Sequence, residues 1–406
     1  MSANDLVIVA ARRTPIGRFL GSLAGQTGVD LGLTAAQAAL ADLRAQGLTE
    51  LPNPRVVFGS ARPAGTGPNP ARQLAVRAGL GHGVVASTVN MACASGMEAV
   101  AQGARLLLAD EARAVLVGGM EAMSRVPFLL DRMRTGYRLG HAPVDDGMYR
   151  DGFLCPLSGK IMGETAETLA REYAISRQEQ DAFALESQER AARALAEGRF
   201  RSEIAPVALT TKAGTQGFTL DEHARADTTP ASLAKLPPVF AADGSVTAGN
   251  SSGITDGAAA LILMRRIEAE AHGLDVLAVL RAWRSAGVDP ARMGIGPVPV
   301  VRALVEADGL PLDRYDLVEL NEAFAAQVIA CDRELHFDRA RLNVNGGAIA
   351  LGHPVGASGA RILVTLIHEL RRRGGGRGLA TLCVSGGMGL AMSIEVSPSS
   401  IGVRPA

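Results

Sequence analysis

The chain has 406 residues, 47% of them hydrophobic, and its 41 Lys and Arg residues balance 41 Asp and Glu residues. This composition is typical of a globular α/β enzyme and excludes intrinsic disorder, while a net charge of zero provides no field that attracts nucleic acid. No apolar run approaches the roughly 18 residues of a membrane span. The arginines near the N-terminus follow the first apolar run, the reverse of a secretory signal. We therefore predict a cytoplasmic protein with no nucleic-acid or membrane partner.

The first 123 residues alternate between strand and helix patterns, which predicts a layered α/β sheet with helices on its faces. Short apolar runs that end in turn residues predict strands over residues 5–15, 55–60, 82–90 and 112–124. Helical spacing predicts helices over residues 28–43 and 69–80, and a third that begins near Cys93. Because the chain is too long for one simple core, we expect more than one domain.

The pattern changes between residues 124 and 249, where charged helices over 163–198 and a Thr/Pro-rich stretch predict an inserted loop domain. The alternation resumes after it, so residues 1–123 plus 250–276 form one predicted α/β half and residues 277–406 the other. "VLVGGMEAMS" in the first half is echoed by "LCVSGGMGLAMS" in the second, and a Gly/Ser-rich helix start precedes each. This internal repeat predicts a pseudo-two-fold relation, with the loops before equivalent helices facing each other.

Four polar residues stand in small-residue motifs that leave room for a substrate. The motifs are Cys93 in "NMACASG", Asn321 in "ELNEAFAAQ", His353 in "NGGAIALGHPVGASG" and Cys383 in "LCVSGGMG". A cysteine reacts as the thiolate, and a histidine within hydrogen-bond reach can take its proton. Taken singly, each residue has an ordinary structural alternative: a buried cysteine packs as a small apolar side chain, and Asn321 suits a helix N-cap. Their joint occurrence among glycines favours a catalytic site.

With these motifs, the sequence resembles the thiolases, the acetyl-CoA C-acyltransferases of the thiolase superfamily, over nearly the whole chain. The resemblance rests on the four motifs in order and on "VTAGNSSGITDGAAA", which matches the stretch that lies along the pantetheine arm of CoA. It implies a duplicated five-layer α-β-α-β-α fold and reversible acyl transfer between CoA thioesters, either thiolytic cleavage of 3-ketoacyl-CoA or Claisen condensation of two acetyl-CoA molecules. It further implies a homo-oligomer, a dimer or dimer of dimers, that uses CoA as substrate and holds no permanent cofactor or metal.

The resemblance also assigns roles to residues. Cys93 becomes the acylated nucleophile, His353 its activating base and Cys383 the acid/base at the α-carbon. A water on Asn321, together with His353, forms one oxyanion site, and the backbone N–H groups of Cys93 and Ser385 form the other. The remaining implied contacts are to substrate and CoA: Ser252, Ala248, Arg225, Ser232, Met162, Phe240 and Phe324.

One departure from the family pattern concerns acyl specificity. Acetoacetyl-forming thiolases usually have His-Met-Gly where this chain has Ile161 before Met162 and Gly163. We therefore expect the enzyme to accept a broader range of 3-ketoacyl groups, or longer ones, than a strict acetoacetyl-CoA thiolase. Two alternatives to a thiolase are a ketosynthase-type condensing enzyme and a non-catalytic acyl-CoA or lipid carrier on the same fold. Cys383 within "GGMG" argues against the first, and the presence of all four polar residues argues against the second.

Overall fold

The strands of the first half pair in the order β4-β3-β5-β10-β1. Their bounds in the computed structural model, which describes residues 3–212 and 214–398, are β1 Leu6–Arg13, β3 Pro54–Gly59, β4 Val85–Val89, β5 Ala114–Ala122 and β10 Thr255–Arg265. β3 lies parallel to β4 and β5, whereas β10 is antiparallel to β5 and β1. All residues of β10 except the last are buried, because helices cover both faces of this sheet.

The second half repeats this strand order. It contains β11 Ala278–Gly287, β12 Leu317–Leu320, β13 Gly376–Val384 and β14 Met388–Val396. They pair in the order β12-β13-β14-β11, and a parallel bridge between Val318 and Leu342 occupies the place that β4 has in the first half. The parallel and antiparallel neighbours match strand for strand. β1 and β11 also pair over Leu6–Ile8, which joins the two halves.

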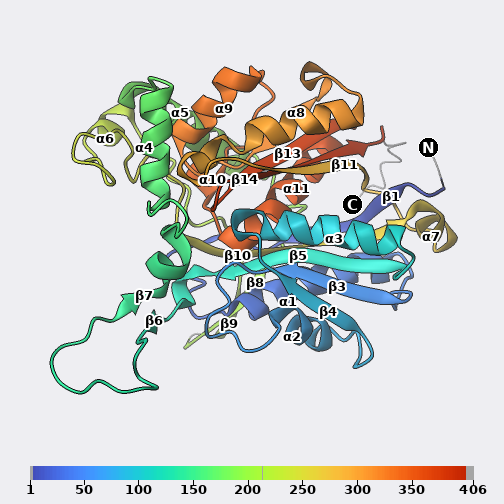
Figure 1. Cartoon of the computed structure of the whole chain (residues 1–406). Helices are drawn as coiled ribbons and strands as arrows, with labels where there is room; N and C mark the ends of the chain where they lie inside the picture. Colours follow the sequence, from blue (N-terminus) through green and yellow to red (C-terminus); the bar gives the residue numbers. More distant parts are fainter. Residues whose placement is uncertain (1–2, 213, 399–406) are drawn as a thin grey trace.

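Two equivalent helices, α3 Ser95–Leu108 and α11 Val355–Arg372, lie between the two sheets (Figure 1). They approach closely because glycines face the contact: a Cβ on Gly96 would lie 2.9 Å from the backbone nitrogen of Ala360, and one on Gly359 would lie 2.7 Å from that of Met97. Outer helices cover the sheets, namely α1 Gly28–Ala45 and α2 Pro70–Arg77 on one and α8 Pro297–Asp308 and α9 Ala325–Leu335 on the other. The predicted duplicated five-layer α-β-α-β-α architecture is confirmed.

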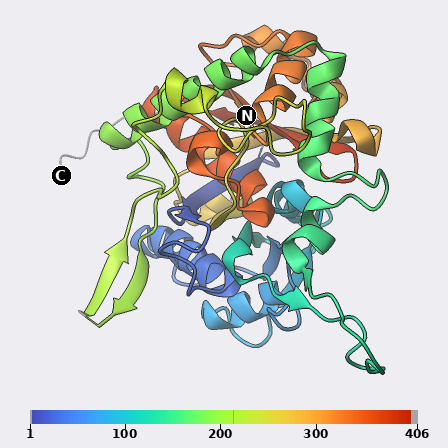
Figure 2. The same cartoon turned by 90° about the vertical axis from the view of Figure 1, so that its left-hand side faces the viewer.

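The segment between β5 and β10 forms its own set of helices and two-stranded sheets. Its helices are η2 Met123–Arg125, η3 Tyr149–Phe153, α4 Met162–Glu172, α5 Arg177–Ala196 and α6 Pro230–Ala234. Its strands are β6 Phe128–Leu129, β7 Asp145–Asp146, β8 Val207–Thr211 and β9 Gly214–Phe218. α4 and α5 lie beside the second half, while the β6–β7 loop and the β8–β9 hairpin project in different directions (Figure 2). α5 begins at a capping box in which Ser176 and Glu179 exchange hydrogen bonds.

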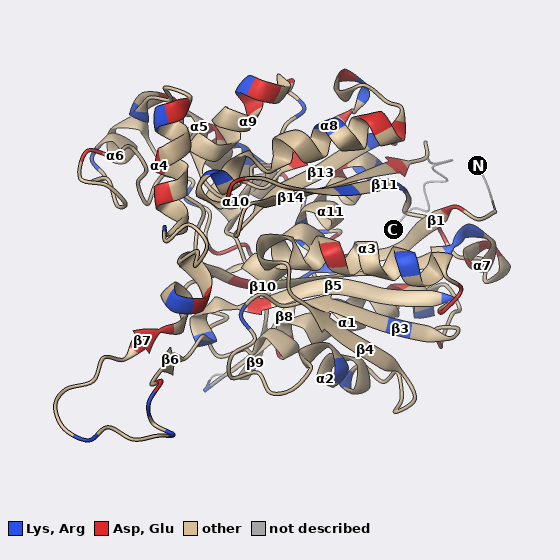
Figure 3. Cartoon of the chain, in the orientation of Figure 1, with Lys and Arg blue, Asp and Glu red and all other residues tan. Residues whose placement is uncertain are grey.

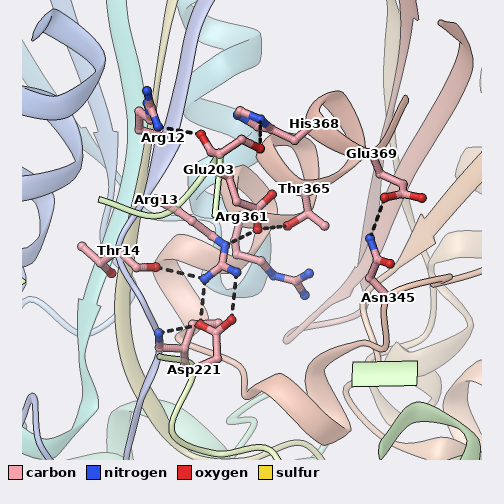
Figure 4. Close-up of polar contacts among 12 residues, drawn as sticks. Arg12, Arg13, Thr14, Glu203, Asp221, Asn345, Arg361, Thr365, His368 and Glu369 are labelled. Carbon is pink, nitrogen blue, oxygen red and sulfur yellow. Dashed lines mark hydrogen bonds and ion pairs between the residues drawn. The ribbon is translucent and has the colours of Figure 1, made fainter. Parts of the chain in front are cut away.

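A buried ionic cluster ties this inserted segment to the central layer (Figure 4). Arg13 at the end of β1 contacts Glu203 at 2.5 Å and Asp221 at 2.8 Å, and all three side chains are buried. Thr365 on α11 donates to the same Glu203 carboxylate at 3.1 Å. Charge-assisted bonds in this dry setting fix α11 relative to β1, so a segment far away in sequence helps to position the helix that follows His353.

Charged side chains of both signs are mixed over the outer helices and loops, and few lie on the sheets (Figure 3). None of the helices within residues 3–212 and 214–398 combines the length and the hydropathy of a membrane span. In the same part of the chain, no three His, Cys, Asp or Glu side chains group as they would around a metal ion. The four cysteines are free thiols. The outer ends of the two predicted halves, residues 1–2 and 399–406, lie outside the described residues.

Candidate active site

Cys93 lies in a sharp turn between β4 and α3. Ala92 adopts a φ of 44°, a left-handed conformation that costs on the order of 1 kcal/mol for a non-glycine residue. Ser95 stabilises this turn, since its Oγ accepts from the N–H of Met91 at 2.9 Å and donates to the carbonyl of Ala92 at 2.7 Å. The strained turn therefore places the Cys93 thiol directly before the N-terminus of α3.

Opposing influences act on the Cys93 thiol. Burial raises its pKa, while the backbone N–H groups of Ser385 and Cys93 itself and the charge of Arg62 lower it. The net effect is a raised pKa, so the resting side chain is a neutral thiol. The two N–H groups that reach the sulfur come from the two halves of the molecule.

His353 precedes α11 just as Cys93 precedes α3. Its backbone N–H donates to Gly253 at 3.0 Å, and Gly352, at a φ of 102°, makes the turn that leads to it. The hydroxyl of Ser358 donates its only proton to the carbonyl of Pro354 at 3.0 Å, so at 2.5 Å it accepts from Nδ1 of His353. This assigns the tautomer with the proton on Nδ1 and leaves Nε2 as the free base.

Nε2 of His353 is buried and has no hydrogen-bond partner among residues 3–212 and 214–398. Burial, with the charges of Arg361 and Arg62, lowers the pKa of the imidazole to about 3. The ring is therefore neutral at physiological pH and can accept a proton from a group in the cavity.

Asn321 directly follows β12, and Cys383 lies on the adjacent strand β13 of the second half. The N–H of Asn321 donates to the carbonyl of Thr381 of β13 at 3.0 Å. Both polar atoms of its side chain are buried without a partner in the described part of the chain. Unpaired buried amides are rare, which points to a bound water or substrate oxygen. Cys383 on β13 is fully buried, and burial together with the neighbouring Cys93 raises its pKa well above the usual value.

A cavity of about 490 Å³ opens onto Cys93, His353 and Ser385. Six of the seven residues expected to contact substrate or CoA also line it, namely Met162, Arg225, Phe240, Ala248, Ser252 and Phe324. The seventh, Ser232, lies outside this lining at the start of α6, where its hydroxyl donates to Thr229 at 2.8 Å. The edge-to-face pair of Phe240 and Phe324, with ring centres 6.1 Å apart, forms an apolar wall.

Sequence patterns did not single out several other lining residues. His223 lines the cavity, where burial and the charge of Arg225 lower its pKa to about 4. A Cβ on Gly253 would overlap the His223 ring at 2.3 Å, so this glycine makes room for it. Arg18 and Arg62 also reach the cavity.

The neutral state of the Cys93–His353 pair has a measurable consequence. Because burial raises the thiol pKa and lowers the imidazole pKa, we expect iodoacetamide alkylation of Cys93 to keep accelerating above about pH 8.5, the usual pKa of a cysteine thiol. Peptide mass spectrometry measures the rate, with N-acetylcysteine as the reference thiol. A plateau that begins near about pH 6, as a thiolate–imidazolium pair produces, would contradict the neutral pair.

The fold and this cavity together define the class of protein: an acyltransferase with two facing α/β halves. The first half matches the description "Thiolase, N-terminal domain" over residues 6–267, and the second matches "Thiolase, C-terminal domain" over residues 274–396. The chain therefore belongs to the thiolase family.

Individual relatives resemble the chain over almost its full length. It is 50% identical to an acetyl-CoA acetyltransferase of Pseudomonas aeruginosa over 392 residues, which cover 96% of this chain and 99% of the relative. It is 49% identical to an acetyl-CoA acetyltransferase of Escherichia coli, with 97% and 99% covered. The crystal structure of human mitochondrial 3-ketoacyl-CoA thiolase in complex with CoA superposes with a TM-score of 0.92 at 40% identity and covers 97% of this chain and 98% of its own.

Proposed function

We propose that this acyltransferase works through an S-acyl intermediate on Cys93. The observation that carries the proposal is the placement of the Cys93 thiol and the unpartnered Nε2 of His353 on one cavity. Nε2 takes the thiol proton as sulfur attacks the carbonyl carbon of an acyl-CoA. The N–H groups of Cys93 and Ser385, which lower the pKa of the thiol, stabilise the carbonyl oxygen as it gains charge.

The second chemical step breaks or forms a carbon–carbon bond. In cleavage of a 3-ketoacyl-CoA, the electron pair of the breaking bond moves onto acetyl-CoA as its enolate, and the neutral Cys383 thiol protonates the α-carbon. In condensation, Cys383 removes that proton and the enolate attacks the acyl thioester. His353 and a water on Asn321 hold the enolate oxygen, a role supported by the unpaired amide of Asn321. In cleavage, free CoA then takes the acyl group from Cys93, whereas in condensation the sulfur–carbon bond to Cys93 breaks as the 3-ketoacyl-CoA forms.

CoA acts in this scheme as a substrate that enters and leaves. Ala248 and Ser252 flank its pantetheine arm, and Arg225 faces its phosphates at the outer end of the cavity. Ser232 is proposed to contact the nucleotide end beyond the cavity. The structural relative solved in complex with CoA supports CoA as the ligand.

The acyl range follows from Ile161, which lines the cavity with Met162 and Phe240. Because this wall is apolar, we expect kcat/KM to increase from acetoacetyl-CoA to 3-ketohexanoyl-CoA by roughly fifteenfold for each two-carbon unit buried. Ile161→His is expected to remove that gain, and Ile161→Val serves as the matched control. A kcat/KM that falls as the chain lengthens would contradict the broader range and indicate a strict acetoacetyl-CoA enzyme.

We further propose three functional segments and a homo-oligomer. Residues 1–123 with 250–276 supply the nucleophile, and residues 277–406 supply the base and the acid. Residues 124–249 supply CoA contacts and an assembly surface.

The β6–β7 loop exposes large apolar side chains, Leu130, Met133, Leu139 and Val144, as a loop that contacts another subunit does. A dimer or dimer of dimers in the cytoplasm, acting in fatty acid metabolism, fits this arrangement, and light scattering measures the assembly.

A further inference from the structure

Arg62 places a positive charge at the acyl end of the cavity. It follows β3, and its side chain lines the cavity beside Cys93. The guanidinium packs against Gly152 of η3, where a Cβ would lie only 2.5 Å from Nε. This close contact, which only glycine permits, holds the guanidinium against the cavity wall.

The donors of this guanidinium are largely unused. Of its five N–H donors, only those of Nη1 have an acceptor among the described residues, the carbonyl of Ala61 at 3.1 Å, and the buried Nε has none. The charge of the Glu121 carboxylate acts on the Arg62 guanidinium. This carboxylate already accepts hydrogen bonds from backbone N–H groups, those of Ala61 at 3.0 Å, Arg62 at 3.1 Å and Gly356 at 2.8 Å. No carboxylate within the described chain forms an ion pair with Arg62.

Arg62 differs in position from the other two arginines that line the cavity. The described lining contains Arg18, Arg62 and Arg225 but no Asp or Glu. Arg18 and Arg225 also line the adjoining depression with Glu222, and the Arg18 side chain is 66% exposed. Arg62, in contrast, lines the same cavity as Cys93 and His353 and acts electrostatically on both, so its charge faces the part of the cavity proposed to hold the acyl group.

We propose that Arg62 is a specificity-determining residue that binds the free carboxylate of a short dicarboxylic acyl group carried on Cys93. A planar guanidinium with unused donors matches a carboxylate, and the pair is worth most where water is excluded. The enzyme then cleaves 3-keto dicarboxylyl-CoA thioesters. The Cys93 sulfur–carbon bond forms as the carbon–carbon bond breaks, and acetyl-CoA leaves with a proton from Cys383. Free CoA then takes the dicarboxylic acyl group, its thiol proton returns to Cys383, and Cys93 regains its proton from His353. This inference rests on the proposed function.

The test compares two substrates of equal length that differ only at the far end: the CoA thioester of 3-oxohexanedioic acid, with its second carboxylate free, and 3-oxohexanoyl-CoA. For the unmodified enzyme, we expect kcat/KM for the carboxylate substrate to exceed that for the neutral one by about tenfold or more. Arg62→Met is expected to lower the carboxylate value by about tenfold to a hundredfold more than it lowers the neutral value. Arg62→Lys keeps the charge but loses the planar donors, so its kcat/KM for the carboxylate substrate is expected to lie between the values of the unmodified enzyme and of Arg62→Met.

Other outcomes distinguish the inference from the proposed function. If the unmodified enzyme prefers the neutral substrate, or if Arg62→Met lowers both values equally, Arg62 acts on the Cys93 chemistry and the specificity role is wrong. The first comparison needs no variant, so it stands even if Arg62→Met folds poorly. Acetylation of Cys93 by acetyl-CoA counts competent sites in each preparation. If no acyl-CoA acylates Cys93, the proposed function itself fails.

Discussion

Replacing Cys93 with alanine is expected to abolish covalent acylation and to lower kcat on the order of a millionfold, as removal of a nucleophile does in serine proteases. The reason is that Cys93 lines the cavity of the described structure and that the backbone N–H groups of Ser385 and Cys93 favour its thiolate. Intact-protein mass spectrometry after incubation with acetyl-CoA measures the result. The unmodified enzyme gains one acetyl group and the variant gains none.

A second cysteine variant controls for the loss of a buried thiol. Cys331 is fully buried in the core of the second half, and its thiol donates to the carbonyl of Gly294 at 3.3 Å. Cys331→Ala is expected to cost about 1 kcal/mol of stability and to keep full acetylation. An acetyl group found on another residue of the Cys93→Ala variant would show that the nucleophile is misassigned.

Replacing Cys383 with serine is expected to separate the two chemical steps. Acetylation of Cys93 stays measurable because His353 and the two N–H groups are untouched. Carbon–carbon bond formation and cleavage fall by about 10² to 10⁴-fold, the usual contribution of one acid–base group, because a serine hydroxyl is a far weaker acid than a thiol. Rapid-quench measurement of acetyl-enzyme, next to steady-state thiolysis of acetoacetyl-CoA, resolves the two steps.

The interpretation of Cys383→Ser depends on how its loss of Cys93 acetylation compares with its loss of thiolysis. The side-chain volume of serine is only slightly smaller than that of cysteine, so the fully buried site beside Phe324 and Met293 keeps its packing. Equal loss in acetylation and in thiolysis would mean that Cys383 shapes the site around Cys93 and moves no proton itself.

The sequence predicted the fold because the two halves repeat a local pattern. Apolar runs buried on both faces, such as β10, read as strands wherever they occur, and the echo of the Gly/Ser-rich helix starts correctly indicated that α3 and α11 are equivalent. That equivalence also explains why Cys93 and His353, 260 positions apart in the numbering, line one cavity.

The rest of the site depends on packing that no local pattern encodes. Arg62 and His223 were not distinguishable from surface residues, since their placement depends on how the inserted segment folds back on the core. Gly152 and Gly253 are the signals that could have identified them, because each leaves the space that a neighbouring cavity side chain fills. The role of Ser358 likewise becomes apparent only when its hydroxyl is seen between Pro354 and the imidazole of His353.

The central claim is that residues from both halves act on a single thioester, and a crystal structure of the acetylated enzyme with CoA bound tests it most directly. We predict that the acetyl oxygen on Cys93 accepts from the N–H groups of Cys93 and Ser385. We also predict that Nε2 of His353 and the Asn321 amide meet the acyl group directly or through one water. An acetyl group on Cys93 that points away from His353, with the imidazole beyond the reach of one bridging water, would contradict it.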